Sequence, residues 1–498
     1  MPTRQAAVIR PSEQPVADRG GGARTIPLVT PGVGARQMIN GITLIAPGAA
    51  IPLHFHDCEE SVIVLDGSAV AVIDGAEHAV GPGDTSWIPP GVPHQFRNPS
   101  GTEPLRIFWT YASATATRTL VATGETRPVT AEHARSPASA AAAPAPRPAA
   151  RLLSVAVLTT FTQRILAAAG LPENDAQAVA DLMIEADLVG ADAHGIFRLP
   201  QYVRRIEGGA VNRTPDIRVH RTAAATALVD GDNGMGHLVM RRAAETAIEL
   251  AQEAGTGWVG VRRSNHAGPA SIYAAMPLAR GMVGLYSAVA SANHMAPWGG
   301  VDALLGTNPL AIAVPVGDAP PVVLDIATTV VSYGTVKAHA LQGRLMPEGW
   351  MIDRRTGAPI TDPAGSGGGV LLPIGGYKGA GLALLLGLLA GVLNGASVGR
   401  DVIDFNADDS SAANTGHFIL ALDVARFIDP AAFAAAVARH LEELRGSARL
   451  PGVAAIRLPG EKRAQRRSRR VRDGIPVSPE LAALLDGLGG RLGIGPLL

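Results

Sequence analysis

The sequence of 498 residues contains a single cysteine, Cys58. One thiol cannot form a disulfide within the chain, and it cannot build a cysteine-rich zinc site. Charged residues are also sparse, at 17%, and 43 basic residues balance 43 acidic ones. A chain without net charge is not expected to bind nucleic acid or another polyanion as its general task. The lack of disulfides suits a reducing compartment, so we expect a cytoplasmic protein.

Long apolar runs are missing as well. The N-terminal residues hold no apolar segment of the length found in secretory signals. The most apolar stretch, Gly379 to Leu393, is shorter than the roughly 20 residues that span a bilayer. We interpret this stretch as a buried helix and expect no membrane association.

The residues that are present predict a multidomain protein of about two to four domains. In residues 25–113, short apolar runs separated by Asp-Gly and Pro-Gly pairs predict an all-β sandwich or barrel. Residues 114–150 are rich in alanine and proline and predict a linker between two halves that fold independently. Residues 151–498 mix strand-like runs with helical patterns, at 173–189 and 237–254, and predict an α/β domain.

A candidate metal site lies in the first of these regions. His54, His56 and Glu60 occupy even positions, so on a continuous strand their side chains would share one face. His94 follows about thirty residues later in a second loop. Three imidazoles and one carboxylate suit a divalent transition metal such as Fe, Mn, Ni, Cu or Zn. Cys58 has the same parity, but we interpret it as a small buried residue.

The same stretches resemble the two signature motifs of the cupin superfamily. The first runs from Gly48 to Gly67 and the second from Gly83 to Asn98, and every anchor position matches. The resemblance implies an all-β cupin barrel that binds metal through the three histidines and the carboxylate. It does not specify an activity, because cupins include enzymes, sensors and sugar-binding modules. The alternative is a barrel that has kept the fold and lost the metal.

Four islands of polar residues stand out in the second half. Histidines in glycine-rich loops can move protons near neutral pH, and arginine binds a carboxylate through two parallel hydrogen bonds. A Gly-Gly-Tyr-Lys-Gly turn at the start of a helix offers backbone N–H groups and a cation to a phosphate. The islands therefore predict acid–base chemistry on an anionic substrate. They contain His194, Arg198 and Tyr202; His266; Ser291, Asn308 and Asp325; and Lys378.

Together the islands resemble the type 2 malate/L-lactate dehydrogenase family over about residues 153–490. That family also includes ureidoglycolate, sulfolactate and diketogulonate enzymes and a cyclic-imine reductase. The resemblance implies an α/β fold that is not a Rossmann fold, a homodimer, and an oxidoreductase that uses NAD or NADP. Its reaction would interconvert a small 2-hydroxy acid and its 2-oxo acid by hydride transfer. The sequence does not choose between NAD and NADP.

The resemblance also implies roles for individual residues. The catalytic group would be His266, His194, Arg198 and Tyr202, with Arg198 on the substrate carboxylate. The cofactor contacts would be Ser291, Asn308, Asp325, Ile326, Ala327, Tyr377, Lys378 and Gly379. The family usually has Ser-His-Gly where this chain has Ala193-His194-Gly195. We therefore expect His266 to be the principal proton donor during reduction, with His194 as its partner.

Two further sequence patterns resemble ligand-binding motifs, but we interpret both as structural features. Gly231, Gly234 and Gly236 form a partial dinucleotide fingerprint, but Val239 stands where the last glycine is expected, so we do not predict a Rossmann site. The run from Lys462 to Arg472 is strongly basic, and we interpret it as a solvated surface rather than a nucleic-acid site.

Several functions remain open for the two halves together. In the first, the dehydrogenase is active and the cupin has a sensory or accessory role. In the second, the cupin catalyses a neighbouring metal-dependent step, which would make the protein a bifunctional enzyme. The C-terminal half could also be a cyclic-imine reductase, or an inactive scaffold that carries a working cupin. Intact His266, Arg198 and Lys378 argue against the inactive scaffold.

Overall fold

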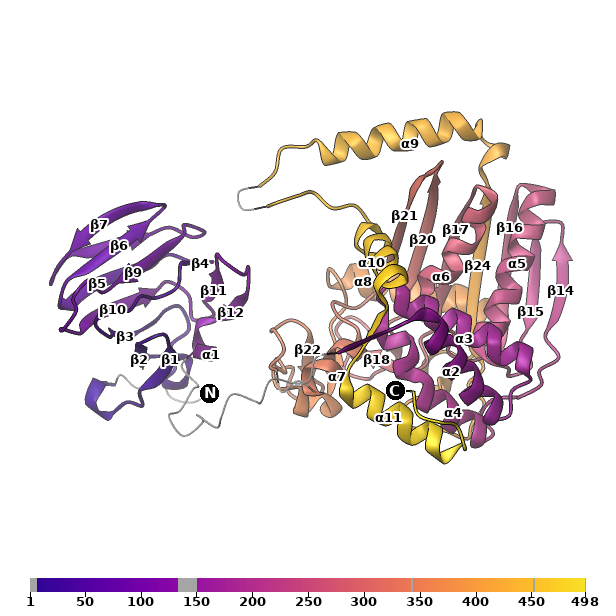
Figure 1. The fold of residues 1–498 in the computed structure, drawn as a ribbon, viewed down its shortest axis with the longest axis horizontal. Coiled ribbons are helices and arrows are strands. Elements are labelled where there is room, and N and C mark those ends of the chain that lie inside the picture. The colour runs from indigo at the N-terminus through magenta and orange to yellow at the C-terminus, as the bar shows by residue number, and fades with distance from the viewer. Residues whose placement is uncertain (1–6, 133–149, 342–343, 451–452, 498) are drawn as a thin grey trace. The chain divides into compact units, whose positions relative to one another are not determined.

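The computed structural model describes residues 7–132, 150–341, 344–450 and 453–497. The chain divides into two compact units, Met1–Arg147 and Pro148–Leu498 (Figure 1). The first unit is all-β and the second mixes helices and strands. Both fold classes agree with the sequence prediction.

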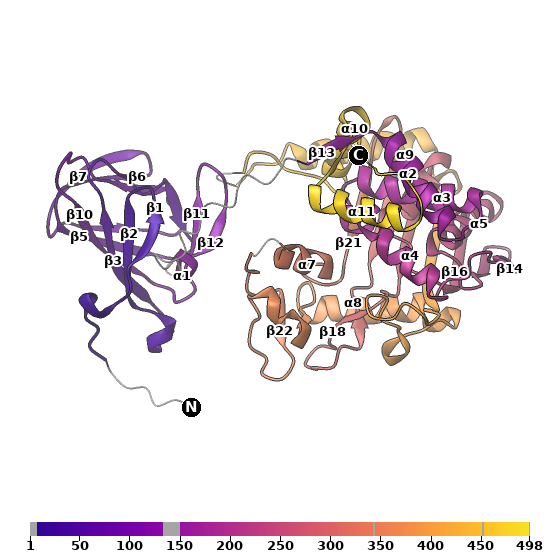
Figure 2. The same ribbon diagram turned by 60° about the horizontal axis from the view of Figure 1, so that its bottom comes forward.

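The first unit contains two six-stranded sheets (Figure 2). Alternate residues of the central strand β10 (Leu105–Tyr111) are buried, as expected for a strand with one face on a core. The remaining strands of its sheet are β1 (Ala17–Gly20), β2 (Ala23–Val29), β3 (Ile39–Ile45), β5 (Glu60–Asp66) and β8 (Thr85–Ile88). The second sheet contains β4 (His54–His56), β6 (Ala69–Ile73), β7 (Ala76–Val80), β9 (His94–Arg97), β11 (Thr117–Leu120) and β12 (Thr126–Pro128).

The linker predicted from residue 114 begins too early. Strand β11 pairs with β4, with Leu120 opposite His54, and β12 pairs with β11. Val129, in the short helix α1 (Val129–Glu132), is buried in the core of the first unit. These elements are short and polar, so their composition resembled a linker. Strand β1 likewise extends the unit before residue 25, while the rest of the predicted linker, 133–149, lies outside the described residues.

The second unit is built on a seven-stranded sheet in which one neighbouring pair is parallel. Strands β15 (Thr226–Asp230) and β16 (Thr256–Ser264) are that pair, and α5 (Gly236–Ala254) connects them. All other pairs in this sheet are antiparallel, whereas a Rossmann fold needs a mainly parallel sheet. The expected non-Rossmann fold is therefore confirmed. The other strands are β14 (Arg218–Ala223), β24 (Thr415–Asp423), β17 (Met282–Ala288), β20 (Leu310–Val316) and β21 (Ala319–Ile326).

Helices and two small sheets surround this sheet. The predicted helices at 173–189 and 237–254 appear as α3 and α5 with ends within one residue. The α-helices of the unit are α2 (Val155–Ala168), α3 (Glu173–Leu188), α4 (Leu199–Glu207), α6 (Ala270–Ala275), α7 (Tyr333–Leu341), α8 (Tyr377–Ala390), α9 (Pro430–Arg445), α10 (Glu461–Asp473) and α11 (Pro479–Arg491). The small sheets are β13 (Arg151–Leu153) with β25 (Ile475–Val477), and β18 (Asn293–Met295), β19 (Leu305–Gly306), β22 (Met351–Asp353) and β23 (Gly369–Leu371).

Short 3-10 helices complete the fold. Two of them carry predicted site residues and follow α3: η4 (Asp192–His194) and η5 (Ile196–Arg198). The others are η1 (Pro11–Glu13), η2 (Pro31–Val33), η6 (Met276–Arg280), η7 (Pro363–Gly368), η8 (Val392–Asn394), η9 (Gly399–Asp401) and η10 (Val424–Arg426).

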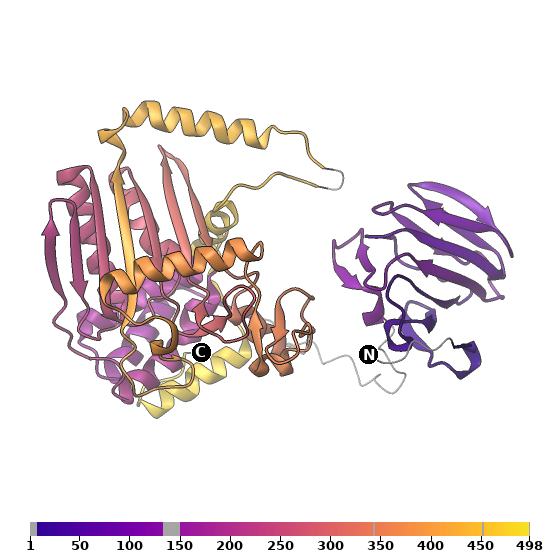
Figure 3. The same cartoon turned by 180° about the vertical axis from the view of Figure 1, so that it is seen from behind.

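Helix α8, the apolar stretch of the sequence, is only half buried. It crosses the large sheet (Figure 3) and packs its small residues against β17 and β24. Phe418 of β24 contacts the α8 cluster while its neighbour Ile419 contacts the α5 cluster, so the two helices cover opposite faces. Leu385 is 59% exposed, which corrects the prediction of a buried helix. By length and composition Tyr377–Asn394 could cross a membrane, but 39% of it is buried in the fold, as in a helix packed on a domain core.

Candidate active site and metal centre

In the first unit, the three predicted histidines and the glutamate converge on one buried point. The ligand atoms of His54, His56, Glu60 and His94 all lie within 4.8 Å of one another. His54 lies directly opposite His94 in the pairing of β4 with β9. The sequence predicted that His54, His56 and Glu60 lie on one continuous strand. The structure instead ends β4 at His56 and begins β5, in the other sheet, at Glu60.

Backbone carbonyls fix the orientation of each imidazole. The Nδ1 atoms of His54, His56 and His94 lie 2.7, 2.8 and 2.9 Å from the carbonyl oxygens of Pro52, Thr117 and Val92. Because a carbonyl only accepts, each Nδ1 carries the proton and each Nε2 presents a lone pair to the cluster.

The donor set fits a cation. The Glu60 Oε2 atom lies 2.7 Å from His94 Nε2 and 3.5 Å from His56 Nε2, so acceptor atoms face one another. Burial lowers the pKa of His54 and of His56, which favours the neutral ring that binds a metal. Burial raises the pKa of the Cys58 thiol to about 11, and Cys58 is not one of the clustered ligands.

In the second unit, a cavity of about 460 Å³ gathers residues from distant parts of the chain. Of the sequence-predicted residues, His194, Arg198, His266, Ser291, Asp325 and Ala327 line it. Tyr202 lies behind the wall, buried in α4. The predicted catalytic group is thus brought together from η4, η5, α4 and the loop after β16.

Two histidines stack face to face in this cavity. The rings of His194 and His266 are 5.4 Å apart and nearly parallel, at 9°. The Gly268 N–H donates to His266 Nδ1 at 3.4 Å, and the Tyr202 hydroxyl lies 2.6 Å from the same atom. Since Nδ1 accepts these hydrogen bonds, the proton of the neutral His266 ring is on Nε2.

Burial keeps both histidines neutral. It lowers the pKa of His194 to about 4 and that of His266 well below its usual value. The neighbouring positive charge of Arg198 acts in the same direction on both rings. The rings therefore titrate below pH 6.5, and at neutral pH His266 offers an Nε2–H to the cavity.

Arg198 supplies the positive charge of the cavity. Its Nε donates to the Ala193 carbonyl at 2.9 Å and its Nη1 to the Gln201 side chain at 2.7 Å. The guanidinium also lies over the Phe405 ring, 5.5 Å from its centroid. Among the residues that the structure describes, Arg198 is ion-paired with no carboxylate. A partly buried guanidinium held in this way suits an anionic ligand.

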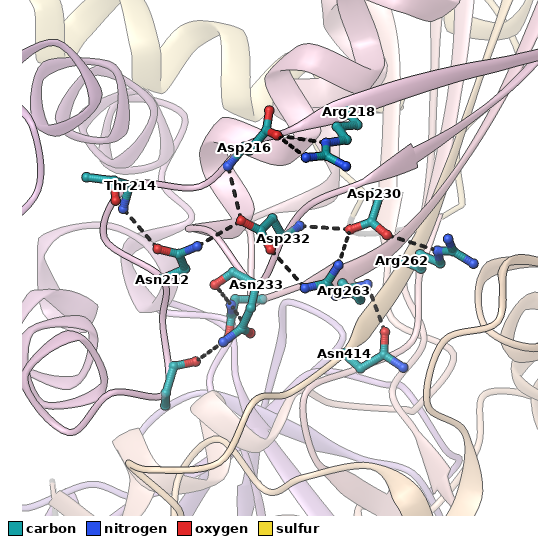
Figure 4. A network of polar contacts seen from close by, with 12 residues as sticks. Asn212, Thr214, Asp216, Arg218, Asp230, Asp232, Asn233, Arg262, Arg263 and Asn414 are labelled. Atoms are coloured by element: carbon teal, nitrogen blue, oxygen red, sulfur yellow. Dashed lines mark hydrogen bonds and ion pairs between the residues drawn. The ribbon is translucent and has the colours of Figure 1, made fainter.

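The glycine-rich turn after β15 supports the loop that carries His266. Arg263 bonds Asp230 at 3.0 Å and Asp232 at 2.8 Å, so these carboxylates are occupied within the protein (Figure 4). Asn265, next to His266, donates to the Gly234 carbonyl at 2.9 Å. A Cβ on Gly236 would lie 2.2 Å from the Asn265 carbonyl oxygen. The partial fingerprint is therefore a packing motif.

Comparisons with known proteins identify the family of each unit. Residues 153–486 match the malate/L-lactate dehydrogenase family, and residues 41–111 match the cupin domain. The chain belongs to the malate/L-lactate dehydrogenase family. We call Pro148–Leu498 the dehydrogenase unit and Met1–Arg147 the cupin unit.

The relatives of the dehydrogenase unit act on hydroxy acids, by their names. Malate dehydrogenase of Pyrococcus horikoshii is 37% identical over 344 residues, which is 68% of this chain and 94% of the relative. L-sulfolactate dehydrogenase of Methanothermobacter thermautotrophicus is 36% identical, over 67% of this chain and 94% of the relative. The solved structure of the Pyrococcus horikoshii enzyme aligns with a TM-score of 0.64 and 34% identity, covering 70% of this chain and 97% of that one.

The predicted cofactor residues of the dehydrogenase unit fall into two groups. Ser291, Asp325 and Ala327 line the cavity, but Ile326, Tyr377, Lys378 and Gly379 do not. Asn308 is also buried away from the cavity, where it accepts from the Ala290 N–H and donates to the Ala383 carbonyl of α8. Asn308 therefore connects the loop at Ala290 to helix α8 through two hydrogen bonds.

The basic run of the dehydrogenase unit is a solvated surface only in part: Lys462, Arg467, Arg469 and Arg472 are exposed, but two other arginines turn inward. It forms α10, and Arg463 reaches the cavity, 3.1 Å from Asp325 Oδ2 and 2.9 Å from Ser271 Oγ. Arg470 is buried and paired with Asp192, beside His194. Composition could not reveal this role, because the acidic partners are distant in the sequence.

A buried aspartate that sequence reasoning missed holds the turn between His194 and Arg198. Asp187 Oδ2 accepts from the Ile196 N–H at 2.9 Å, and burial raises the pKa of this carboxyl to about 8. A Cβ on Gly195 would lie 2.1 Å from Asp187 Oδ1. Gly195 is therefore required by this close approach. In the sequence, the glycine directly after His194 was the one sign that another group packs against the turn.

Replacing this glycine tests the support of the site. Gly195→Ala should destabilise the unit by about 1–3 kcal/mol through overpacking, and should lower kcat/KM by about 10²-fold through displacement of His194 and Arg198. Thermal unfolding and steady-state kinetics measure the two effects. Gly487→Ala is the matched control, because that glycine lies exposed in α11 with open space around it. A Gly195→Ala protein as stable and active as the control would contradict the close approach.

Proposed function

We propose that the dehydrogenase unit interconverts a small 2-hydroxy acid and its 2-oxo acid with NAD or NADP. The observation that carries this proposal is the placement of Arg198, without a carboxylate partner in the described chain, beside the stacked His194 and His266 in one cavity. The names of the relatives, which include malate, sulfolactate and ureidoglycolate dehydrogenases, support this reaction class.

A nicotinamide cofactor fits the residues present. The cavity volume lies in the range of roughly 300–1,000 Å³ typical of ligand sites, and Ser291, Asp325 and Ala327 on its wall would hold the nicotinamide end. The glycine turn that begins α8, with Lys378, would hold a phosphate. When bound, the cofactor would give the hydride during reduction and take it during oxidation. Relatives named for NAD+ and for NADP+ both occur, in Escherichia coli and Chromohalobacter salexigens, so their names do not select one.

The protein's own groups would then bind the substrate and hold its proton. Arg198 orients the substrate carboxylate next to the histidine pair. Protonated His266 would transfer its Nε2 proton to the carbonyl oxygen of the 2-oxo acid, where negative charge builds up during reduction, and would be left as a neutral ring with its proton on Nδ1. The Tyr202 hydroxyl lies 2.6 Å from Nδ1 and fixes the orientation of the ring. The His194 ring stacks on the His266 ring and would limit its rotation.

A substrate panel tests this function. The full chain is mixed with pyruvate, oxaloacetate, sulfopyruvate and a cyclic imine carboxylate, each with NADH and with NADPH, and nicotinamide absorbance is followed. We expect at least one 2-oxo acid to reach a kcat/KM of about 10⁴ M⁻¹s⁻¹ or more. Turnover of the imine alone would favour the cyclic-imine alternative, for which the structural match to Δ1-piperideine-2-carboxylate reductase of Pseudomonas syringae (28% identity, TM-score 0.60) is the support. A folded protein that turns over nothing in the panel would contradict both.

Replacement of His266 tests the proton donor. His266→Asn should lower kcat by about 10²–10⁴-fold, because asparagine cannot transfer a proton, and His194→Asn should cost less. Since reduction would use the protonated ring and burial lowers the pKa of His266, the limb on which the rate of reduction falls with rising pH should lie below pH 6.5 and should vanish in His266→Asn. His440→Asn, an exposed residue of α9, is the control. An intact limb in His266→Asn, with turnover abolished in His194→Asn, would reverse the two roles.

For the cupin unit, we propose one divalent metal, Fe, Mn, Ni or Zn, held by His54, His56, Glu60 and His94. Full-length protein reconstituted with each metal should contain about one metal ion per chain. His94→Ala should lose most of it, and His78→Ala, an exposed histidine of β7, should not. Wild-type protein that stays metal-free with all four metals would rule out the site. The sensory or accessory role of this unit and its bifunctional alternative stay open.

Assembly stays a prediction. The homodimer implied by the family resemblance would have to cover exposed apolar surface. Helix α8 provides such a surface, because its outer face carries exposed leucines. No nucleic-acid or membrane partner is proposed, and the cytoplasmic location remains an expectation.

A further inference from the structure

A chain of hydrogen bonds connects the wall of the 460 Å³ cavity to the loop that carries His266. Tyr286 of β17 and His417 of β24 are both buried and both line the cavity. The Tyr286 hydroxyl lies 2.8 Å from His417 Nδ1, and His417 Nε2 lies 3.1 Å from Ser264 Oγ. The Ser264 hydroxyl in turn donates to the Asn265 carbonyl at 3.4 Å.

The direction of each hydrogen bond in this chain is fixed. A carbonyl oxygen only accepts, so Ser264 donates to Asn265, and Ser264 Oγ accepts from His417 Nε2. Burial lowers the pKa of His417 to about 3, so at neutral pH the ring carries a single proton, on Nε2. His417 Nδ1 is therefore an acceptor, and the Tyr286 hydroxyl donates to it.

The Tyr286 oxygen is left as an acceptor at the cavity wall. Its proton is directed to His417, and in the part of the chain that the structure describes this is the one hydrogen bond of the hydroxyl. The ring packs against Tyr273, with 5.4 Å between the ring centroids, which limits its movement. A ligand group that meets this oxygen must donate an N–H or an O–H. A carboxylate or phosphate oxygen would meet a lone pair.

We propose that the Tyr286 hydroxyl accepts a hydrogen bond from the carboxamide N–H of the nicotinamide ring. This inference rests on the proposed function, in which Ser291 and Asp325 hold the nicotinamide end of NAD or NADP. After burial, the charge of Asp325 raises the pKa of the Tyr286 hydroxyl, so Tyr286 lies near that end. The carboxamide is the N–H donor at the reacting end of the cofactor. A hydrogen bond to it fixes the rotation of the ring, and with it the face that the ring turns to the substrate.

Two cofactors that differ in this one group test the inference. The 3-acetylpyridine analogue of NADH has a methyl ketone in place of the carboxamide, so it keeps the carbonyl and lacks the N–H. Isothermal titration calorimetry without substrate gives the dissociation constants of NADH and of the analogue for the full chain; NADPH and its analogue are used if NADPH binds more tightly. Wild-type chain should prefer the natural cofactor. Tyr286→Phe should reduce the ratio of the two constants by about three- to tenfold, the effect of one neutral hydrogen bond.

Tyr273→Phe is the matched control. Tyr273 is also fully buried, its hydroxyl donates to the Ala267 carbonyl at 2.6 Å, and it is not among the residues that line the cavity. This variant should lose a similar amount of thermal stability and keep the wild-type ratio. An unchanged ratio in Tyr286→Phe would overturn the inference, and so would an equal loss for both cofactors, which indicates packing or a ribose contact. A chain that binds neither NADH nor NADPH would contradict the proposed function and this inference with it.

The tautomer of His417 is an independent check that decides the question even if Tyr286→Phe does not fold. In wild-type chain labelled with ¹⁵N-histidine, the ring signals that disappear in His417→Gln should be those of a neutral ring with its proton on Nε2 at neutral pH. A proton on Nδ1 would overturn the proposal, because Tyr286 would then accept from His417 and direct its own proton elsewhere.

Discussion

Arg198 keeps a permanent charge in a cavity whose histidines are held neutral by burial. A guanidinium does not lose its proton at any pH the protein meets, so it cannot relieve the cost of burial by neutralisation. The cavity therefore combines a fixed positive charge with uncharged imidazole rings, because burial lowers the pKa of His194 and His266. An anion that binds to Arg198 in this cavity therefore lies near the Nε2–H of His266.

This arrangement requires a rigid support, because it rests on loops. Two contacts fix the turn from His194 to Arg198. Asp187 accepts a hydrogen bond from the Ile196 N–H within the turn, and Arg470 of α10 pairs with Asp192 just before it. The turn that carries His266 is held by Asn265, whose amide bonds the glycine-rich loop before α5. Residues from three separate parts of the sequence thus fix two short loops. Their geometry follows from these contacts rather than from regular secondary structure.

The sequence predicted the elements and missed the contacts between them. Helices α3 and α5 follow from apolar periodicity and closing glycines, and the all-β class of the cupin unit follows from its turn pairs. Periodicity could not show that Arg463 meets Asp325, because the partners are far apart in the chain. Likewise, strand β11 was mistaken for linker because four residues with little apolar character carry almost no periodic signal. The half exposure of α8 was missed because leucine content does not say which face is covered.

The two units use histidine in opposite tautomers, and a small backbone difference decides which. In the cupin unit, carbonyl oxygens accept from Nδ1 of His54, His56 and His94, so Nε2 is a lone pair that can bind a metal. In the dehydrogenase unit, the Gly268 N–H donates to Nδ1 of His266, so the neutral ring keeps its proton on Nε2 and can donate a hydrogen bond to an oxygen. Burial lowers the pKa of His54, His56 and His266 alike. Whether the backbone offers a carbonyl or an N–H to Nδ1 therefore decides whether Nε2 presents a lone pair or a proton.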